Sequence, residues 1–199
     1  MPSLSVPAGR GPAAPETIRD TAAMETFNHT LFDTRFGPAA IAATGRGVIR
    51  LALPAYDPDE LVEEVAVDSG LVPSDGGNSA SDYGIDDMVG AVDAFLDGKS
   101  TGIDLAIDWR LASGFTHRIL RATMEIPYGE TRSYGEIAIG AGCPRAHRAA
   151  GTALSKNPVA LVIPCHRVIR SDGKPGAYGR GSEGRKLKRA LLALEADRS

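Results

Sequence analysis

The chain has 199 residues, of which 43% are hydrophobic and 24% charged, with a formal net charge of -3. This is the composition of an ordinary globular protein, and the length suits one large domain or two small ones, so we expect two compact halves. No apolar run approaches the roughly 18 residues of a membrane span. The Pro-, Ala- and Gly-rich start lacks the continuous apolar stretch of a secretory signal, and we expect residues 1–22 to form a disordered tail.

Two cysteines, Cys143 and Cys165, occur in the chain. They are too few for a disulfide framework or a cysteine-rich zinc site. This usage favours a reducing compartment, and we expect a cytoplasmic protein.

Charge is distributed unevenly along the chain. Residues 1–112 carry 7 basic and 18 acidic side chains, a balance of -11, whereas residues 113–199 carry 15 and 7, a balance of +8. Such asymmetry predicts that the C-terminal half meets a polyanion. The alternative is a charge fluctuation without a partner.

The first half, residues 23–112, has the pattern of a small α/β domain. Short β-rich pieces separated by Gly and Pro predict an antiparallel sheet, and segments with apolar residues at helical spacing predict helices. The expected elements are hairpin strands at 29–36 and 47–54, helices at 57–70 and 88–99, a polar loop at 68–84, and an edge strand or connector at 103–109.

The second half, residues 113–199, is predicted to be mainly helical. Helices are expected at 115–126, 133–142 and 145–156, the last one entered through Cys143 and Pro144. A short helix, a tight turn and a helix rich in small and basic residues form a helix-turn-helix pattern.

The stretch LVIPCHRVIR, residues 161–170, does not read as a plain core strand. A free cysteine after apolar residues is usually inert, but Pro158 and Pro164 bracket the predicted strand at 159–163 and place Cys165 at a backbone turn. His166 and Arg167 supply the proton-accepting and cationic groups that a reactive thiol needs. The adjacency predicts an unusual turn in which the imidazole reaches the thiol directly or through a water.

A Cys-His hydrolase is one alternative for this motif. Its base would lie far away in sequence, because adjacent residues of an extended chain point to opposite sides. His29, His117 and His147 are available as distant bases, but none lies in a hydrolase motif.

The string IPCHRVIRSDG, together with IPYGETRSYGEIA, PRAHRAAGTAL and LLALE, resembles the signature of the O6-alkylguanine-DNA alkyltransferases. The resemblance covers nearly all of residues 113–199 and extends loosely into the first half through FDTRFGPAAIAATGRGVIRLAL. It implies a ribonuclease H-like N-terminal α/β domain and a winged-helix-like C-terminal domain. It also implies direct-reversal DNA repair, in which the alkyl group of O6-alkylguanine moves irreversibly to a cysteine without a cofactor. We expect a monomer, since the DNA-contacting helix needs one lesion and no palindrome.

The resemblance assigns a role to each matching residue of the site. Cys165 is the alkyl acceptor, His166 draws off the thiol proton through a water, and Glu195 orients the histidine. Asn157 is the hinge that braces the turn before the nucleophile, although Asn also suits a helix C-cap. Tyr134 hydrogen-bonds the guanine and assists its departure, whereas without the motif it would be a core aromatic.

Double-stranded DNA with a flipped base is the implied partner. Val168, Tyr178 and Gly179 would form the base pocket, and Arg148 would fill the gap that the guanine leaves. The remaining residues would let the helix approach the minor groove (Ala146, Ala149, Ala150 and Gly151) or contact phosphates (Arg145, Lys156 and the Arg185-Lys186 pair).

Three features depart from the family pattern. His147 stands where a small residue is usual, and the segment 179–185 is longer than in some relatives. Some members bind zinc in the N-terminal half, but this one has only His29 there, and we predict no metal. Two rival functions remain open: a DNA-damage sensor without turnover, and the Cys-His hydrolase.

Overall fold

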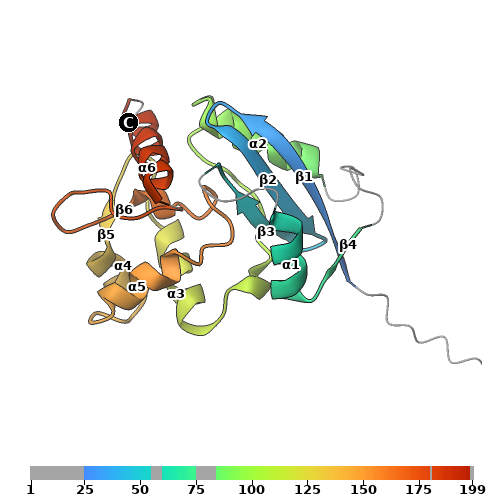
Figure 1. Cartoon of the computed structure of the whole chain (residues 1–199). Coiled ribbons are helices and arrows are strands. Elements are labelled where there is room, and N and C mark those ends of the chain that lie inside the picture. The colour runs from blue at the N-terminus through green and yellow to red at the C-terminus, as the bar shows by residue number, and fades with distance from the viewer. Residues whose placement is uncertain (1–24, 55–59, 75–83, 180, 198–199) are drawn as a thin grey trace, which may run out of the picture.

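A computed structural model describes residues 25–54, 60–74, 84–179 and 181–197 (Figure 1). The predicted tail at 1–22 and residues 75–83 of the predicted loop lie outside these ranges. The described chain has a mixed α/β fold with a four-stranded sheet and six α-helices.

The sheet lies in the N-terminal half. Three strands form an antiparallel meander, and a short fourth strand pairs in parallel with the first, which gives the order β3-β2-β1-β4. The strands are β1 (Thr26–Thr34), β2 (Gly37–Thr44), β3 (Gly47–Ala52) and β4 (Val72–Pro73). The two predicted hairpin strands correspond to β1 and β3.

Both faces of the sheet are covered, which explains why β2 is buried from Ala39 to Thr44. Alternate side chains of a strand point to opposite faces. Ala40 and Ala42 pack in one cluster with α1 (Leu61–Ser69). Ala39, Ile41 and Ala43 point to the other face and pack with α2 (Ile85–Leu96) and the C-terminal half.

The C-terminal half is mainly helical, with a two-stranded parallel pairing of β5 and β6. Ser133 and Glu136 form a capping box at the start of α4, which fixes where that helix begins. The elements are η1 (Trp109–Leu111), α3 (Gly114–Met124), β5 (Arg132–Ser133), α4 (Tyr134–Gly140), α5 (His147–Leu154), η2 (Cys165–Arg167), β6 (Val168–Ile169) and α6 (Gly181–Ala196).

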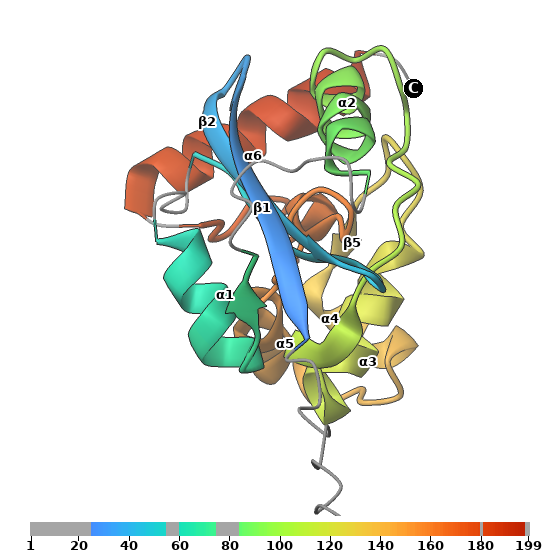
Figure 2. The ribbon, with the colours of Figure 1, turned by 90° about the vertical axis from the view of Figure 1, so that its right-hand side faces the viewer.

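One hydrophobic cluster joins the two halves. It contains residues of β2, β3 and α2 together with residues of α3, α4, α5 and α6. Leu51 of β3 also exchanges backbone hydrogen bonds with the segment after α5, donating to Pro158 at 2.9 Å and accepting from Ala160 at 3.4 Å. These hydrogen bonds anchor the segment that leads to Cys165 on the sheet. In Figure 2 the strands cross in front of α6.

The predicted strand at 159–163 is wrong. Only isolated bridges occur there, Leu51 with Val159 and Ala160 with Ile163, and the chain turns tightly between them. Leu161 has φ of 69°, and it is the one non-glycine residue with positive φ in the described chain. A left-handed leucine costs about 1–2 kcal/mol, so the surroundings must hold this turn in place.

The segment 103–109 is a connector rather than a strand. Ile107 makes a single bridge to Val48, and the chain then enters η1 at Trp109.

Candidate active site

Cys165 begins the short 3-10 helix η2 directly after Pro164 and is 6% exposed. Asn157 holds the turn on both sides: its Nδ2 donates to the Ile163 carbonyl at 3.0 Å, and its Oδ1 accepts from the Val159 amide at 3.0 Å. The same Nδ2 lies 3.0 Å from Cys165 Sγ. The side chain of Asn157 therefore stabilises the tight turn and positions the thiol.

The thiol is protonated at rest. Burial raises the pKa of Cys165, and the hydrogen bond from Asn157 and the charge of Lys188 offset this only in part. A thiolate here consequently requires a proton acceptor at the moment of reaction.

Glu195 of α6 supplies a fixed negative charge beside the neighbouring histidine. Its Oε1 lies 2.7 Å from His166 Nε2, its Oε2 accepts from Arg167 Nε at 2.9 Å, and the Gly129 amide donates to it at 3.0 Å. Burial alone would raise the pKa of Glu195, but the hydrogen bonds from His166 and Arg167 outweigh it and lower the pKa to about 2.

An ionised Glu195 can only accept, so His166 Nε2 carries the proton of that hydrogen bond. Burial lowers the pKa of His166 despite the raising effect of Glu195, which favours a neutral ring. The other nitrogen, Nδ1, is then an acceptor, and it has no hydrogen-bond partner among the described residues. The ring makes no direct hydrogen bond to Cys165 in the described chain, so a proton would have to pass between them through a bridging group.

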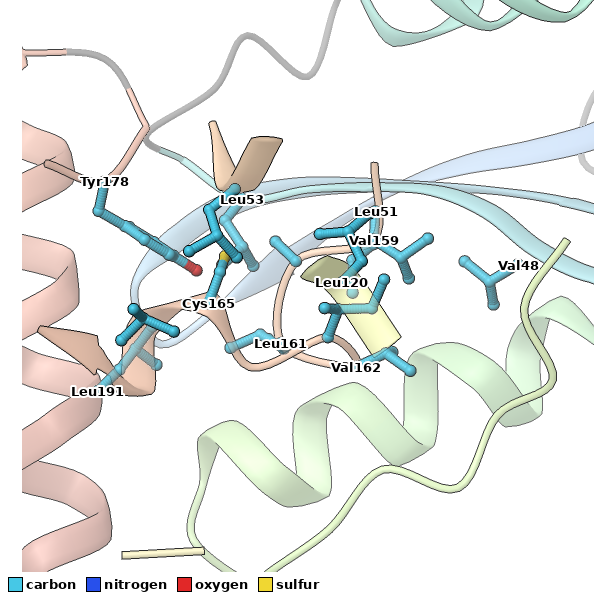
Figure 3. Packing of buried hydrophobic residues seen from close by; sticks show 14 of the residues in the cluster. Val48, Leu51, Leu53, Leu120, Val159, Leu161, Val162, Cys165, Tyr178 and Leu191 are labelled. Atoms are coloured by element: carbon cyan, nitrogen blue, oxygen red, sulfur yellow. The ribbon is translucent and has the colours of Figure 1, made fainter. Parts of the chain in front are cut away.

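Cys165 lines a cavity of about 690 Å³. Predicted residues Tyr134, Gly151, Lys156, Asn157, Tyr178 and Gly179 share this lining, and the N-terminal half adds Arg50, Glu64, Asp68 and Arg110. Figure 3 shows Tyr178 pointing toward Cys165. Val168 is fully buried and lies outside the lining, and its carbonyl accepts a hydrogen bond from Lys188 Nζ at 2.5 Å.

Tyr134 stands at the first position of α4, partly buried against the cavity. Burial raises the pKa of its hydroxyl, and the nearby Cys165 adds to that effect. The hydroxyl therefore remains protonated and is available as a hydrogen-bond donor.

The basic residues of α5 and of the segments that flank it are exposed. Arg145, His147, Arg148, Ala149 and Lys156 are exposed, whereas Ala146 and Gly151 are half-buried. The expectation for Ala150 was wrong: it is fully buried in the core, because it lies on the opposite side of the helix from Arg148.

Lys188 is a residue that the sequence analysis missed. It is fully buried on α6, its Nζ lies 6.0 Å from the centre of the Tyr178 ring, and burial lowers its pKa to about 8. The signal was the buried stripe of α6, where Gly184, Leu187, Lys188, Leu191 and Glu195 recur at helical spacing. A lysine and a glutamate at buried positions of an otherwise apolar stripe indicate candidate functional residues.

Among the described residues, no group of three or more His, Cys, Asp or Glu side chains comes together as a metal site would require. Within the same residues, no helix combines the length and apolarity needed to cross a membrane.

Fold and site together define a class: a mixed α/β protein with a buried cysteine held next to a His-Glu pair, in a mainly helical half that contains the short helices α4 and α5. Residues 114–197 match a family model described as 6-O-methylguanine DNA methyltransferase, DNA binding domain. A methylated-DNA--protein-cysteine methyltransferase of Mycobacterium tuberculosis is 36% identical over 87% of this chain and 94% of its own length. One from Mycolicibacterium paratuberculosis is 43% identical over 73% and 85%. The chain belongs to the methylated-DNA--protein-cysteine methyltransferase family.

Solved structures agree with this membership. The M. tuberculosis O6-methylguanine methyltransferase, 35% identical, covers 87% of this chain and 94% of its own, with a TM-score of 0.67. A structure of the same protein in complex with DNA gives the same values. The enzyme of Pyrococcus kodakaraensis, 23% identical over 85% and 98% with a TM-score of 0.56, shows the shared fold.

Proposed function

We propose that this protein repairs DNA by direct reversal, moving the alkyl group of O6-alkylguanine in a duplex to the sulfur of Cys165. The observation that carries this is the buried Cys165 thiol, held by Asn157 in the wall of a cavity beside the His166-Glu195 pair. The family name of the relatives specifies the same chemistry.

In the proposed reaction the Cys165 sulfur attacks the alkyl carbon, so a C–S bond forms while the C–O6 bond breaks. The bonding pair of C–O6 moves into the guanine ring. The thiol proton passes to His166 Nδ1 through a water, and Glu195, whose low pKa keeps it ionised, stabilises the resulting imidazolium.

The departing guanine needs a proton, because it leaves with an extra electron pair. Tyr134 is a hydroxyl donor in the same cavity as Cys165, and its raised pKa keeps it protonated until charge develops on the base. The thioether left on Cys165 is a poor leaving group, so each protein molecule reacts once.

Reaction inside a duplex requires the damaged base to leave the stack. We assign this step to α5, whose exposed Arg148 would fill the gap while Ala149 allows a close approach to the minor groove. Arg148→Ala should therefore slow transfer from duplex DNA more than transfer from the free alkylated base. Equal losses on both substrates would contradict the assignment.

The finer fold description also belongs to the proposal. A winged-helix-like C-terminal domain is supported by α4 and α5 flanked by the β5-β6 pairing. A ribonuclease H-like N-terminal domain is supported by the antiparallel meander with β4 parallel to β1. We keep the boundary between these domains near residue 112.

The two rival functions are less favoured. A sensor without turnover would not need the Asn157 and His166-Glu195 contacts that surround the thiol. A Cys-His hydrolase acting on small molecules would not need Arg148 of α5 and the flanking Arg145 and Lys156 to be exposed.

The test is the mass of the protein after incubation with a duplex that contains O6-methylguanine. One methyl group should appear on the peptide with Cys165, saturating at one per protein. Cys165→Ser should bind the duplex without gaining mass, and Cys143→Ser is the matched control, expected to react normally. A methyl group on Cys143, or none with the DNA still bound, would refute the proposal.

A further inference from the structure

A second cavity, of about 440 Å³, lies next to the reaction cavity. The two share Tyr134 and Ala177 in their linings, so this part of the chain forms a common wall. The second cavity is also lined by four basic side chains, Arg170, Lys174, Arg185 and Arg189, which we call the basic cluster.

The basic cluster comes from two elements. Arg170 and Lys174 face each other across the turn that follows β6, where the Arg170 amide donates to the Lys174 carbonyl at 2.9 Å. Arg185 and Arg189 are four residues apart on α6, which places them on the same face of that helix. Segments fixed by backbone hydrogen bonds thus bring four cations to one site.

Negative charge within the cluster is low. Asp172 pairs with Arg170 at 3.0 Å and lies 3.7 Å from Lys174. In the described part of the chain, no carboxylate forms an ion pair with Arg185 or Arg189. Because like charges gathered around one cavity repel each other, the arrangement is suited to an anion that bridges several of them.

We propose that the basic cluster binds backbone phosphates of the lesion-bearing strand, adjacent to the nucleotide in the reaction cavity. This inference rests on the proposed function. A nucleotide that occupies one side of the Tyr134-Ala177 wall keeps its own backbone close to the other side, and guanidinium groups match phosphate oxygens in pairs. The cluster then holds the strand while α5 contacts the groove.

The structure also separates two residues that the sequence analysis grouped. Both are exposed, but Arg185 lines the cavity, whereas Lys186 lies outside it and pairs with Glu183 at 2.8 Å. Lys186 is therefore a matched control on the same helix, with the same charge.

The first experiment compares binding of an O6-methylguanine duplex to the full chain and to the double variant R185A/R189A over a range of salt concentrations. Each lost phosphate contact lowers the slope of log K against log salt by about 0.9, so the double variant should lose about 2. K186A should keep the slope of the original chain. An unchanged slope in the double variant would overturn the proposal.

The second experiment identifies the strand. Neutral methylphosphonates next to the lesion in its own strand should weaken binding of the original chain about tenfold or more and should not weaken the double variant further, because both changes remove the same contacts. Methylphosphonates in the complementary strand should weaken both proteins equally. Equal sensitivity of the two proteins to the lesion-strand substitution would overturn the assignment.

Transfer from free O6-benzylguanine separates this inference from the proposed function. If R185A/R189A gains the adduct on Cys165 at the original rate while its duplex binding is unaltered, the basic cluster has no DNA role and the function stands. If the original chain gains no adduct from free O6-benzylguanine or from the O6-methylguanine duplex, the proposed function itself is refuted.

Discussion

Asp108 and Glu195 are both buried carboxylates, one at the end of the N-terminal half and one on the last helix. Asp108 accepts hydrogen bonds from Thr44 Oγ1 at 2.7 Å and from Arg110 Nε at 2.8 Å, so it ties β2 to the connector before α3. Glu195 accepts from His166 and Arg167, next to the nucleophile.

In both places a carboxylate is stabilised by an arginine, and burial, which alone would raise its pKa, is outweighed by hydrogen bonds. The partners decide the consequence. Thr44 and Arg110 do not change protonation near neutral pH, whereas His166 can take up a proton. The same local electrostatics therefore strengthens the fold in one region and prepares a proton acceptor in the other.

The largest expected effect comes from neutralising each carboxylate. Glu195→Gln should slow alkyl transfer to Cys165 by between about 10²- and 10⁴-fold, because the His166 imidazolium loses its counter-charge. Asp108→Asn should leave the transfer rate unchanged and lower the free energy of unfolding by about 1–3 kcal/mol. Single-turnover rates with free O6-benzylguanine and urea titrations measure the two quantities. A transfer defect of equal size in Asp108→Asn would erase the distinction.

Acid unfolding should show the Glu195 contribution directly. A folded-state pKa of about 2 against 4.5 in the unfolded chain corresponds to about 3 kcal/mol of stability. It is fully present above pH 4.5 and is lost as the pH falls toward 2, because protonation removes the charge that His166 and Arg167 stabilise. Urea midpoints measured between pH 6 and 2 should fall less steeply for Glu195→Gln. Parallel curves would contradict the low pKa.

Two glycines provide a matched steric comparison. A Cβ at Gly184 would lie 1.6 Å from the Tyr178 carbonyl oxygen, and one at Gly47 would lie 2.3 Å from the Ala106 carbonyl oxygen. Gly184→Ala should slow transfer about tenfold, because the backbone of Tyr178 and Gly179 in the cavity wall must move. Gly47→Ala should cost about 2 kcal/mol of unfolding free energy without a rate change in the folded protein. Normal transfer by Gly184→Ala would show that the wall position is not critical.

The smallest expected effect concerns two tyrosines of the C-terminal half. Tyr134→Phe should slow transfer about fivefold, since it removes one hydrogen bond worth about 1 kcal/mol to the departing base. Tyr128, whose hydroxyl donates to the Leu194 carbonyl at 3.3 Å, is the comparison: Tyr128→Phe should lower stability by about 1 kcal/mol. Single-turnover rates with free O6-benzylguanine and urea titrations measure these two effects. A rate loss in Tyr128→Phe but not in Tyr134→Phe would exclude Tyr134 from the mechanism.

In both halves the local sequence pattern predicts most of the secondary structure. Short β-rich pieces separated by Gly and Pro predicted β1 and β3, and helical spacing with Pro and Gly boundaries predicted α3, α4 and α5 to within a few residues. The interruption of an apolar run by Pro164, Cys165, His166 and Arg167 marked the site. The role of Glu195 came from the resemblance, because its residue type and terminal position are ordinary.

Only the tertiary structure decided which distant groups meet. His166 and Glu195 are 29 residues apart, and their contact depends on how α6 packs against η2. The predicted strand at 159–163 was wrong because of the turn at Leu161. Asn157 and the edge of β3 hold this segment in a backbone conformation that an apolar sequence does not favour by itself. The burial of Lys188 and the convergence of the basic cluster on one cavity were also visible only in the tertiary structure. Periodicity is a local property, whereas burial, pKa and convergence of charge depend on packing between segments far apart in the chain.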